Sequence, residues 1–244
     1  MQLMISRDLL LQAINLISKA ADKRHNMVIL GNMKLALTNT QLVMVASDLE
    51  LELQATLNLP ESACKQPGEI TVPANKFKDI VKLLPDGLPV SITVGDDKQC
   101  LIVCGSSRFK LSTLPAQDFP MLGEPEQVTP IQLPREALVD LLDKTHFAMA
   151  VQDVRYYLNG MLFETEGSEL RTVATDGHRL AVCSMPLEES LPNHSVIVPR
   201  KGVIELMRML DGGDTPLRVQ IGSNNIRAHV GDFIFTSKLV DGRF

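Results

Sequence analysis

The chain has 244 residues, of which 45% are hydrophobic, and its 24 Lys and Arg against 29 Asp and Glu give a formal net charge of −5. Such a composition excludes a disordered chain, and no run of 18 apolar residues is present to cross a membrane. The N-terminus lacks the basic start of a secretory signal, and four cysteines favour reduced thiols over a disulfide scaffold. We therefore expect a cytoplasmic protein, and the acidic balance argues weakly against a nucleic-acid partner.

Helix and strand patterns follow one another in the first half of the chain. Apolar residues recur with helical spacing after Ser6, a candidate capping residue, in a helical segment that we place at 6–24. A second helix is predicted from Pro73, a favourable first-turn residue, and Pro85 stops it. Residues 49–54 alternate apolar and polar side chains, which predicts an antiparallel sheet with one face in water.

A proline-rich stretch separates the two halves. Residues 113–134 contain five prolines, which block both helices and strand ladders, so we predict an extended surface connector and a domain boundary near residue 125. Two further helices are predicted at 134–144 and 199–210, the second ended by Gly212-Gly213. Short strands at hairpin spacing complete the pattern, at residues 90–94, 99–104, 108–111, 217–221, 226–230 and 233–236.

The second half of the chain repeats the first. Landmarks recur in the same order at a spacing that drifts from 128 to 125 residues: 30–33 with 158–161, 46–48 with 174–176, 72–73 with 198–199, 112–114 with 237–239, and Phe119 with Phe244. Each copy is predicted to hold two helices and roughly eight strands, and two helices are too few to cover both faces of a sheet. The predicted fold class is therefore α+β, with two tandem copies at residues 1–125 and 126–244.

Few residues have the patterns of catalysis or metal binding. No glycine-rich phosphate loop and no paired Cys-x-x-Cys motif is present, and Cys100 and Cys104 on one predicted strand favour buried thiols, so we expect no cofactor and no metal. Asp176 beside His178 could orient a catalytic base, and the alternative is a tight turn between two strands. The aligned position in the first copy has Asp48 without a histidine, which favours the turn.

Charge is divided unequally between the helical segments and the rest of the chain. The four helical segments hold 12 Lys and Arg against 9 Asp and Glu, a net charge of +3, which leaves −8 for the remainder. One interpretation is ordinary solvated helix surface. The other is that the helices lie on one side of a sheet and face a polyanion through sequence-independent phosphate contacts.

Tyr156 and Tyr157 would face opposite ways on a strand, which suggests a contact surface.

Several segments resemble the bacterial DNA polymerase III beta subunit, the replication sliding clamp: residues 109–120, 154–163, 174–181, 198–201 and 237–244. The resemblance implies the DNA clamp fold, in which two protomers of three like domains form a ring with helices lining the hole and sheets outside. Such a ring is not an enzyme. It is a processivity factor that encircles duplex DNA and tethers the replicative polymerase, so weak and exchangeable phosphate contacts suit its sliding.

The resemblance also implies two sets of functional residues at matching positions. DNA contacts would lie at Arg24, Gln152, Tyr156 and Tyr157, with Lys76, Arg200 and Lys201 as basic residues at helix starts. Asn75 stands where the family has an arginine, and Val151 where a polar residue is usual. The cleft for short hydrophobic peptides of polymerase and clamp-loader subunits would be formed by Arg155, Leu158, Thr175, Gly177, His178, Arg179 and Leu180, with Leu158 and Leu180 as the anchoring pocket.

The family has a third domain, which supplies the head-to-tail surface of the homodimer, whereas this chain stops at Phe244. We therefore expect a fragment or shortened product that cannot close a ring by itself. Two other functions remain open, a small two-domain enzyme with Asp176 and His178 in its site, and a self-associating scaffold with exposed strand edges. Replacing His178 by alanine would abolish turnover in the enzyme, but would weaken only peptide capture in the clamp.

Overall fold

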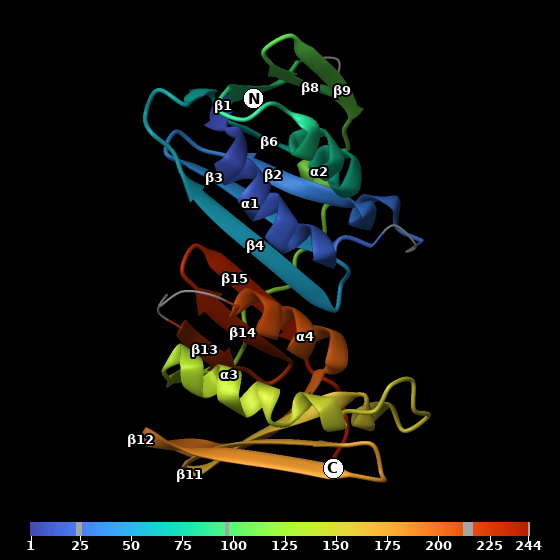
Figure 1. The fold of residues 1–244 in the computed structure, drawn as a ribbon, viewed down its shortest axis with the longest axis vertical. Helices are drawn as coiled ribbons and strands as arrows, with labels where there is room; N and C mark the ends of the chain where they lie inside the picture. The colour runs from blue at the N-terminus through green and yellow to red at the C-terminus, as the bar shows by residue number, and fades with distance from the viewer. Residues whose placement is uncertain (23–25, 96–97, 212–216, 244) are drawn as a thin grey trace. The chain divides into compact units, whose positions relative to one another are not determined.

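The computed structural model describes residues 1–22, 26–95, 98–211 and 217–243, and the chain divides into two compact units, Met1–Leu122 and Gly123–Phe244 (Figure 1). Both units combine two α-helices with antiparallel strands, which confirms the predicted α+β class. None of the helices in these ranges is long and apolar enough to span a membrane.

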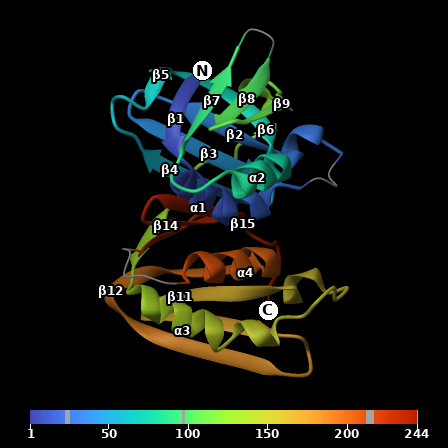
Figure 2. The same cartoon turned by 45° about the horizontal axis from the view of Figure 1, so that its top comes forward.

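The strands of the first unit form two antiparallel runs, β5-β1-β7-β8-β9 and β4-β3-β2-β6. Helix α1 lies against β3 and β4, helix α2 lies against β2 and β6, and the two helices contact each other (Figure 2). The elements are β1 (Gln2–Ser6), α1 (Arg7–Ile17), β2 (Asn32–Leu37), β3 (Gln41–Ser47), β4 (Leu51–Asn58), β5 (Cys64–Gln66), β6 (Gly68–Pro73), α2 (Ala74–Leu83), β7 (Pro89–Val94), β8 (Gln99–Cys104) and β9 (Ser107–Ser112).

The second unit is built in the same way with fewer, longer strands. Its strands form the run β10-β13-β14-β15 and the long pair β11-β12, and helices α3 and α4 contact each other and both strands of that pair. The elements are β10 (Thr129–Gln132), α3 (Arg135–Asp143), β11 (Gly160–Thr175), β12 (Leu180–Pro199), α4 (Arg200–Met209), β13 (Leu217–Ile221), β14 (Asn225–Val230) and β15 (Phe233–Lys238).

Strand registers confirm that one domain plan is used twice. Two register pairs of the first unit return in the second: Asn32↔Pro73 as Gly160↔Pro199 and Ser47↔Glu52 as Thr175↔Leu180. The isolated bridge Thr71↔Leu114 has its counterpart, Ile197↔Val240, one residue further along the aligned chain. Strand β11 therefore covers the positions of β2 and β3, and β12 covers those of β4 and β6. The register shift between Thr165 and Glu169 lies where β2 and β3 would be separated.

An arginine at the start of the first helix binds the end of the second helix in each unit. In the first unit, Arg7 donates from Nε to the Val81 carbonyl at 3.2 Å and from Nη2 to the Lys82 carbonyl at 2.9 Å. In the second unit, Arg135 donates to the carbonyls of Leu210 at 2.9 Å and Met209 at 3.5 Å. These carbonyls lie at or next to helix C-termini, where free C=O groups and the helix dipole favour a cation. The repeat thus includes the contact that positions its two helices.

The predicted helices are confirmed, but their ends differ in detail. Ser6 occupies the N-cap of α1 without a side-chain hydrogen bond to the helix, and α1 ends at Ile17 rather than extending through 6–24. Pro73, Pro134 and Pro199 stand at the N-cap rather than in the first turn, because their ψ angles of 110–149° are still extended. The predicted stop at Gly212-Gly213 lies outside the described residues.

The proline-rich connector was predicted to contain no strand, and this was wrong. Strand β10 includes Pro130 and pairs with β13 from Thr129↔Ile221 to Gln132↔Arg218. Because β10 is the first strand of its run, the proline sits in a position where sheets tolerate one.

The alternation predicted for residues 49–54 holds only in part. Leu49 precedes β4 and adopts a positive φ of 74°. Glu52, expected on the wet face, is only 2% exposed, and its carboxylate accepts a hydrogen bond from the Leu122 amide at 2.7 Å. A partner 70 residues away in the chain therefore turns this polar position inward.

Substitution of Arg135 by methionine tests the contact between the helices. Methionine keeps an apolar stem but leaves the carbonyls of Met209 and Leu210 without their donor, which should lower the free energy of unfolding by about 1–3 kcal/mol. Urea unfolding followed by circular dichroism measures the change. The exposed Arg218→Met control should lose less than about 0.5 kcal/mol, and equal losses in the two variants would contradict the assignment.

Candidate functional site

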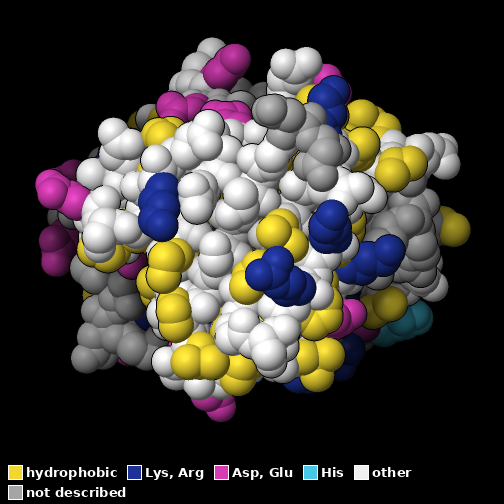
Figure 3. All heavy atoms as spheres, turned by 90° about the horizontal axis from the view of Figure 1, so that it is seen from above, with side chains coloured by type: hydrophobic (Ala, Val, Ile, Leu, Met, Phe, Trp, Pro, Cys, Tyr) yellow, Lys and Arg dark blue, Asp and Glu magenta, His cyan; other side chains and the backbone are white. Residues whose placement is uncertain are grey.

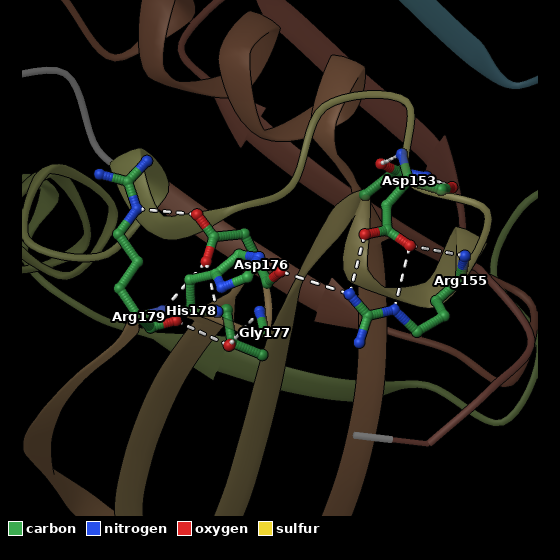
Figure 4. Close-up of polar contacts among 8 residues, drawn as sticks. Asp153, Arg155, Asp176, Gly177, His178 and Arg179 are labelled. Atoms are coloured by element: carbon green, nitrogen blue, oxygen red, sulfur yellow. Dashed lines mark hydrogen bonds and ion pairs between the residues drawn. The ribbon is translucent and has the colours of Figure 1, made fainter.

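The turn between β11 and β12 brings most of the predicted cleft residues together. The Thr175 hydroxyl accepts from the Gly177 amide at 3.1 Å and donates to the Arg179 carbonyl at 2.7 Å. Asp176 Oδ1 accepts from the amides of His178 and Arg179 at 2.9 and 3.0 Å (Figure 4). Gly177 has a φ of 86°, a left-handed conformation that favours glycine.

The same turn occurs in the first unit, where no histidine is present. Asp48 Oδ1 accepts from the amides of Glu50 at 2.9 Å and Leu51 at 2.7 Å, and the Ser47 hydroxyl accepts from the Leu49 amide at 3.2 Å. An aspartate that binds the amides two and three residues ahead is a standard turn former. The duplication supports the interpretation of residues 175–179 as a turn.

The carboxylate of Asp176 is engaged with the backbone and with an arginine. Its Oδ2 accepts from Arg179 Nε at 2.9 Å. The hydrogen bond from the His178 amide, followed by those from Arg179, holds the pKa of Asp176 below its usual value. Both carboxylate oxygens thus serve the turn, which leaves them poorly placed to orient the His178 imidazole as a base.

A second ion pair lies beside this turn. Arg155 binds the Asp153 carboxylate with two hydrogen bonds: Nε donates to Oδ1 at 3.0 Å, and Nη2 donates to Oδ2 at 2.9 Å. Arg155 Nη2 also donates to the Asp176 carbonyl at 3.4 Å. The hydrogen bonds from Arg155 lower the pKa of Asp153 to about 2. A Cβ atom at Gly177 would come within 2.9 Å of Arg155 Nη2, so a side chain at residue 177 would require the guanidinium to shift away from the turn.

Of the two leucines predicted to form the apolar pocket of the cleft, only one is exposed to solvent. Leu180 is 66% exposed, whereas Leu158 is 5% exposed and belongs largely to the core. Phe147, which the sequence did not single out, is 50% exposed, and the Arg179 guanidinium carbon lies 5.5 Å from its ring centroid. The exposed apolar and planar surface at this turn is therefore provided by Leu180, Phe147 and Arg179.

The loop before β11 is tied to the start of α4. The Asn159 side-chain amide makes two hydrogen bonds to the backbone of Asp153, both at 2.9 Å: Oδ1 accepts from the Asp153 amide, and Nδ2 donates to the Asp153 carbonyl. The backbone carbonyl of Asn159 accepts from the Arg200 amide at 2.8 Å. Arg200 Nη1 donates to the Met149 carbonyl at 3.3 Å. This loop carries Gln152, which is exposed with a φ of 57°.

Tyr156 and Tyr157 do not lie on a strand, so their predicted placement was wrong. They form the 3-10 turn Tyr156–Leu158, closed by the Leu158 amide on the Arg155 carbonyl at 2.9 Å. Their rings meet edge to face with centroids 5.9 Å apart, and Tyr156 is 59% exposed. The tyrosines thus lie on the loop that Arg200 anchors.

The remaining predicted DNA contacts are placed as follows. Lys201 is exposed in the first turn of α4, and Lys76 is exposed in the first turn of α2, with Asn75 half-buried beside it. Val151, which precedes Gln152, is 68% exposed. Arg24 lies outside the described residues.

The helical segments carry a net charge of +3, but several of their cations are engaged in contacts within their own unit. Arg7 and Arg135 bind carbonyls of the neighbouring helix, Lys144 pairs with Asp140 at 2.7 Å, and Arg208 pairs with Glu205 at 2.5 Å. On the face drawn in Figure 3, Lys and Arg side chains stand among hydrophobic ones rather than in a continuous stripe. The net charge of the helical segments is thus divided between cations held in structural contacts and exposed ones such as Lys76 and Lys201.

Two observations on the described parts of the chain concern metal-binding clusters and reactive thiols. No three side chains among His, Cys, Asp and Glu there lie close enough to hold a metal ion. Burial raises the pKa of the Cys100 thiol to about 12, which suits an inert core residue.

Family comparisons agree with the duplicated architecture. Residues 1–123 match the model of the N-terminal domain of the DNA polymerase III beta subunit, and residues 132–244 match the model of its central domain. The chain belongs to the DNA polymerase III beta subunit family.

Relatives of this beta-subunit chain match over its whole length. It is 59% identical to the beta sliding clamp of Salmonella typhimurium and 57% identical to that of Escherichia coli K12, and it spans 66% of each of those proteins. A crystal structure of the DNA polymerase III subunit beta from Pseudomonas aeruginosa superimposes with a TM-score of 0.94 at 46% identity, covering all of this chain and 66% of that one.

Titration of Asp153 tests the ion pair of this beta-subunit chain. Because its pKa is lowered from 3.8 to about 2, the pair contributes stability above about pH 4 and loses it as the pH falls through about 2. Carboxyl-detected NMR should give a midpoint near 2. In Arg155→Gln the midpoint should rise toward 3.8, and an unchanged midpoint would contradict the assignment.

Proposed function

We propose that this chain acts as a processivity factor, a non-catalytic clamp module that encircles duplex DNA with its partner domains and tethers a replicative polymerase. The observation that carries this proposal is the match of both units to successive domains of the beta subunit family, supported by corresponding strand pairs in the two units. Printed names of relatives, such as beta sliding clamp, agree with this role. The site of action would be the bacterial cytoplasm. By resemblance, the assembled clamp would be a head-to-tail homodimer of full-length, three-domain protomers.

DNA binding is assigned to helix starts and to the loop that Arg200 anchors. Lys76, Arg200 and Lys201 would contact phosphates, and Gln152, Tyr156 and Tyr157 would meet the backbone from the loop, with Arg24 as a further contact by resemblance. Helix N-termini also present free N–H groups and a partial positive charge, which favour phosphate without reading the bases. Such contacts would be weak, exchangeable and independent of sequence.

Partner docking is assigned to the turn at residues 175–180. A short hydrophobic peptide of a polymerase or clamp-loader subunit would rest on Leu180 and Phe147 and approach the backbone at Gly177. Arg155, Thr175, His178 and Arg179 would supply the polar rim, and Leu158 would support the pocket from below. The enzyme alternative with Asp176 and His178 receives no support, because the carboxylate of Asp176 is engaged in the turn.

Neutralising Lys201 tests the DNA assignment. Lys201→Gln should weaken binding to duplexes of unrelated sequence by a similar factor and reduce the slope of log affinity against log salt by about one. Fluorescence anisotropy of labelled duplexes over a salt series measures both quantities. Lys110→Gln, an exposed lysine of β9, is the matched control and should leave the slope unchanged. The assignment fails if the two variants behave alike.

Truncating Leu180 tests the docking assignment. Leu180→Ala should weaken binding of a short synthetic peptide containing Leu and Phe by about tenfold, the range expected for one apolar anchor. DNA affinity should stay unchanged, because Leu180 is not among the residues assigned to DNA contact. Leu83→Ala, which removes an 80%-exposed leucine from α2, is the control and should bind the peptide normally. Unaltered peptide binding by Leu180→Ala would contradict the proposal.

A further inference from the structure

A row of polar side chains crosses the sheet of the second unit away from both assigned sites. Gln132 on β10 is the register partner of Arg218 on β13, and Arg218 is the partner of His229 on β14. Direct cross-strand partners project from the same face with Cβ atoms about 5 Å apart. The alternating residues Leu217 and Val219 are 7% and 4% exposed, so the row lies on the face turned away from the core.

The row borders a hollow in the surface. Its volume is about 380 Å³, and its lining consists of Gln132, Leu217, Arg218, His229 and Gly231. A volume of this size accommodates several groups as large as a water molecule. An amide, a guanidinium and an imidazole together offer N–H donors into one space.

The charges on this face are unbalanced. Arg227, two residues from His229 along β14, is compensated by Glu124 at 3.1 Å, whereas Arg218 makes no ion pair with any residue that the structure describes. Burial, together with the cations Arg227 and Arg218, lowers the pKa of His229, and Glu124 acts weakly in the opposite direction. Arg218 therefore lacks a counter-ion among the described residues, and a bound anion would supply one.

The first unit provides an internal comparison. Its strands β1, β7 and β8 place Met4, Ser91 and Val103 as register partners in the equivalent row. These side chains carry no charge. The domain plan therefore does not require the polar row of the second unit.

We propose that Gln132, Arg218 and His229 form a binding site for a phosphate or carboxylate group on the outer face of the second unit. Arg218 supplies a planar pair of donors that fits either group, and the Gln132 amide adds a third donor. His229 Nε2 lies 3.2 Å from Gln220 Oε1, which leaves Nδ1 for the ligand. Nδ1 donates a hydrogen bond only when the ring is protonated, so binding strengthens as the pH falls through the pKa of His229. The charges of Arg218, Arg227 and Glu124 act on that pKa.

NMR of the His229 ring during titration with sodium phosphate, at ionic strength held constant with sodium chloride, tests the site. A parallel titration with sodium acetate separates the two ligand chemistries, since the group that saturates at the lower concentration identifies the preferred ligand. The ring shift should saturate, and the pKa of His229 should rise in the bound state. Arg218→Gln should weaken the apparent affinity at least about tenfold, as expected for loss of a charged hydrogen-bond donor.

Matched variants decide the outcome. Arg108→Gln, which removes an exposed arginine of β9, should bind as the unaltered chain does. His229→Gln, followed through the backbone amide signals of β13 and titrated with acetate, which stays ionised near neutral pH, should bind with no pH dependence in that range. Arg218→Gln should retain its affinity for duplex DNA, which separates this site from the proposed clamp function. A shift that never saturates with either ion, saturation that survives Arg218→Gln, or loss of DNA binding in that variant would overturn the proposal.

Discussion

Two arginines, Arg7 and Arg135, hold the helices of their units together by donating to carbonyls at the end of the neighbouring helix. A helix C-terminus carries partial negative charge and unpaired carbonyl groups, so a buried guanidinium binds it strongly. This contact uses the C-terminal end of each second helix and leaves the N-terminal end free. Lys76, Arg200 and Lys201, the cations proposed to contact phosphate, lie at the opposite, N-terminal ends of these second helices, whereas Arg7 and Arg135 belong to the first helices.

At the turn of residues 175–180, which we propose as a docking surface, polar and apolar side chains also have different tasks. Asp176 and Thr175 satisfy the backbone of the turn, and Asp153 holds Arg155 against it. With the polar groups fixed in this way, Leu180 remains exposed at the surface although it is apolar. Rigid polar support beneath an exposed apolar side chain is what a peptide-binding surface needs, because little conformational entropy is then lost on binding.

The sequence could predict the repeat, the fold class and the four helices, because apolar spacing and prolines are local signals. The turn at Asp176 could also be predicted, since its twin at Asp48 lacks the histidine. The arginine contacts could not, because nothing near Arg135 in the chain indicates partners 74 and 75 residues away. Burial of Glu52 and of Leu158 depends on tertiary neighbours, and the 3-10 turn at Tyr156 depends on how Asn159 closes its loop.

The central claim is that helix starts and the loop at residues 150–159 meet duplex DNA while the sheets do not. Amide hydrogen exchange of the chain with and without a duplex of arbitrary sequence tests this most directly. The account predicts slower exchange at the starts of α2 and α4 and along that loop, with the same pattern for a second, unrelated duplex. Protection confined to β7–β9 or β13–β14, or a pattern that changes with DNA sequence, would contradict it.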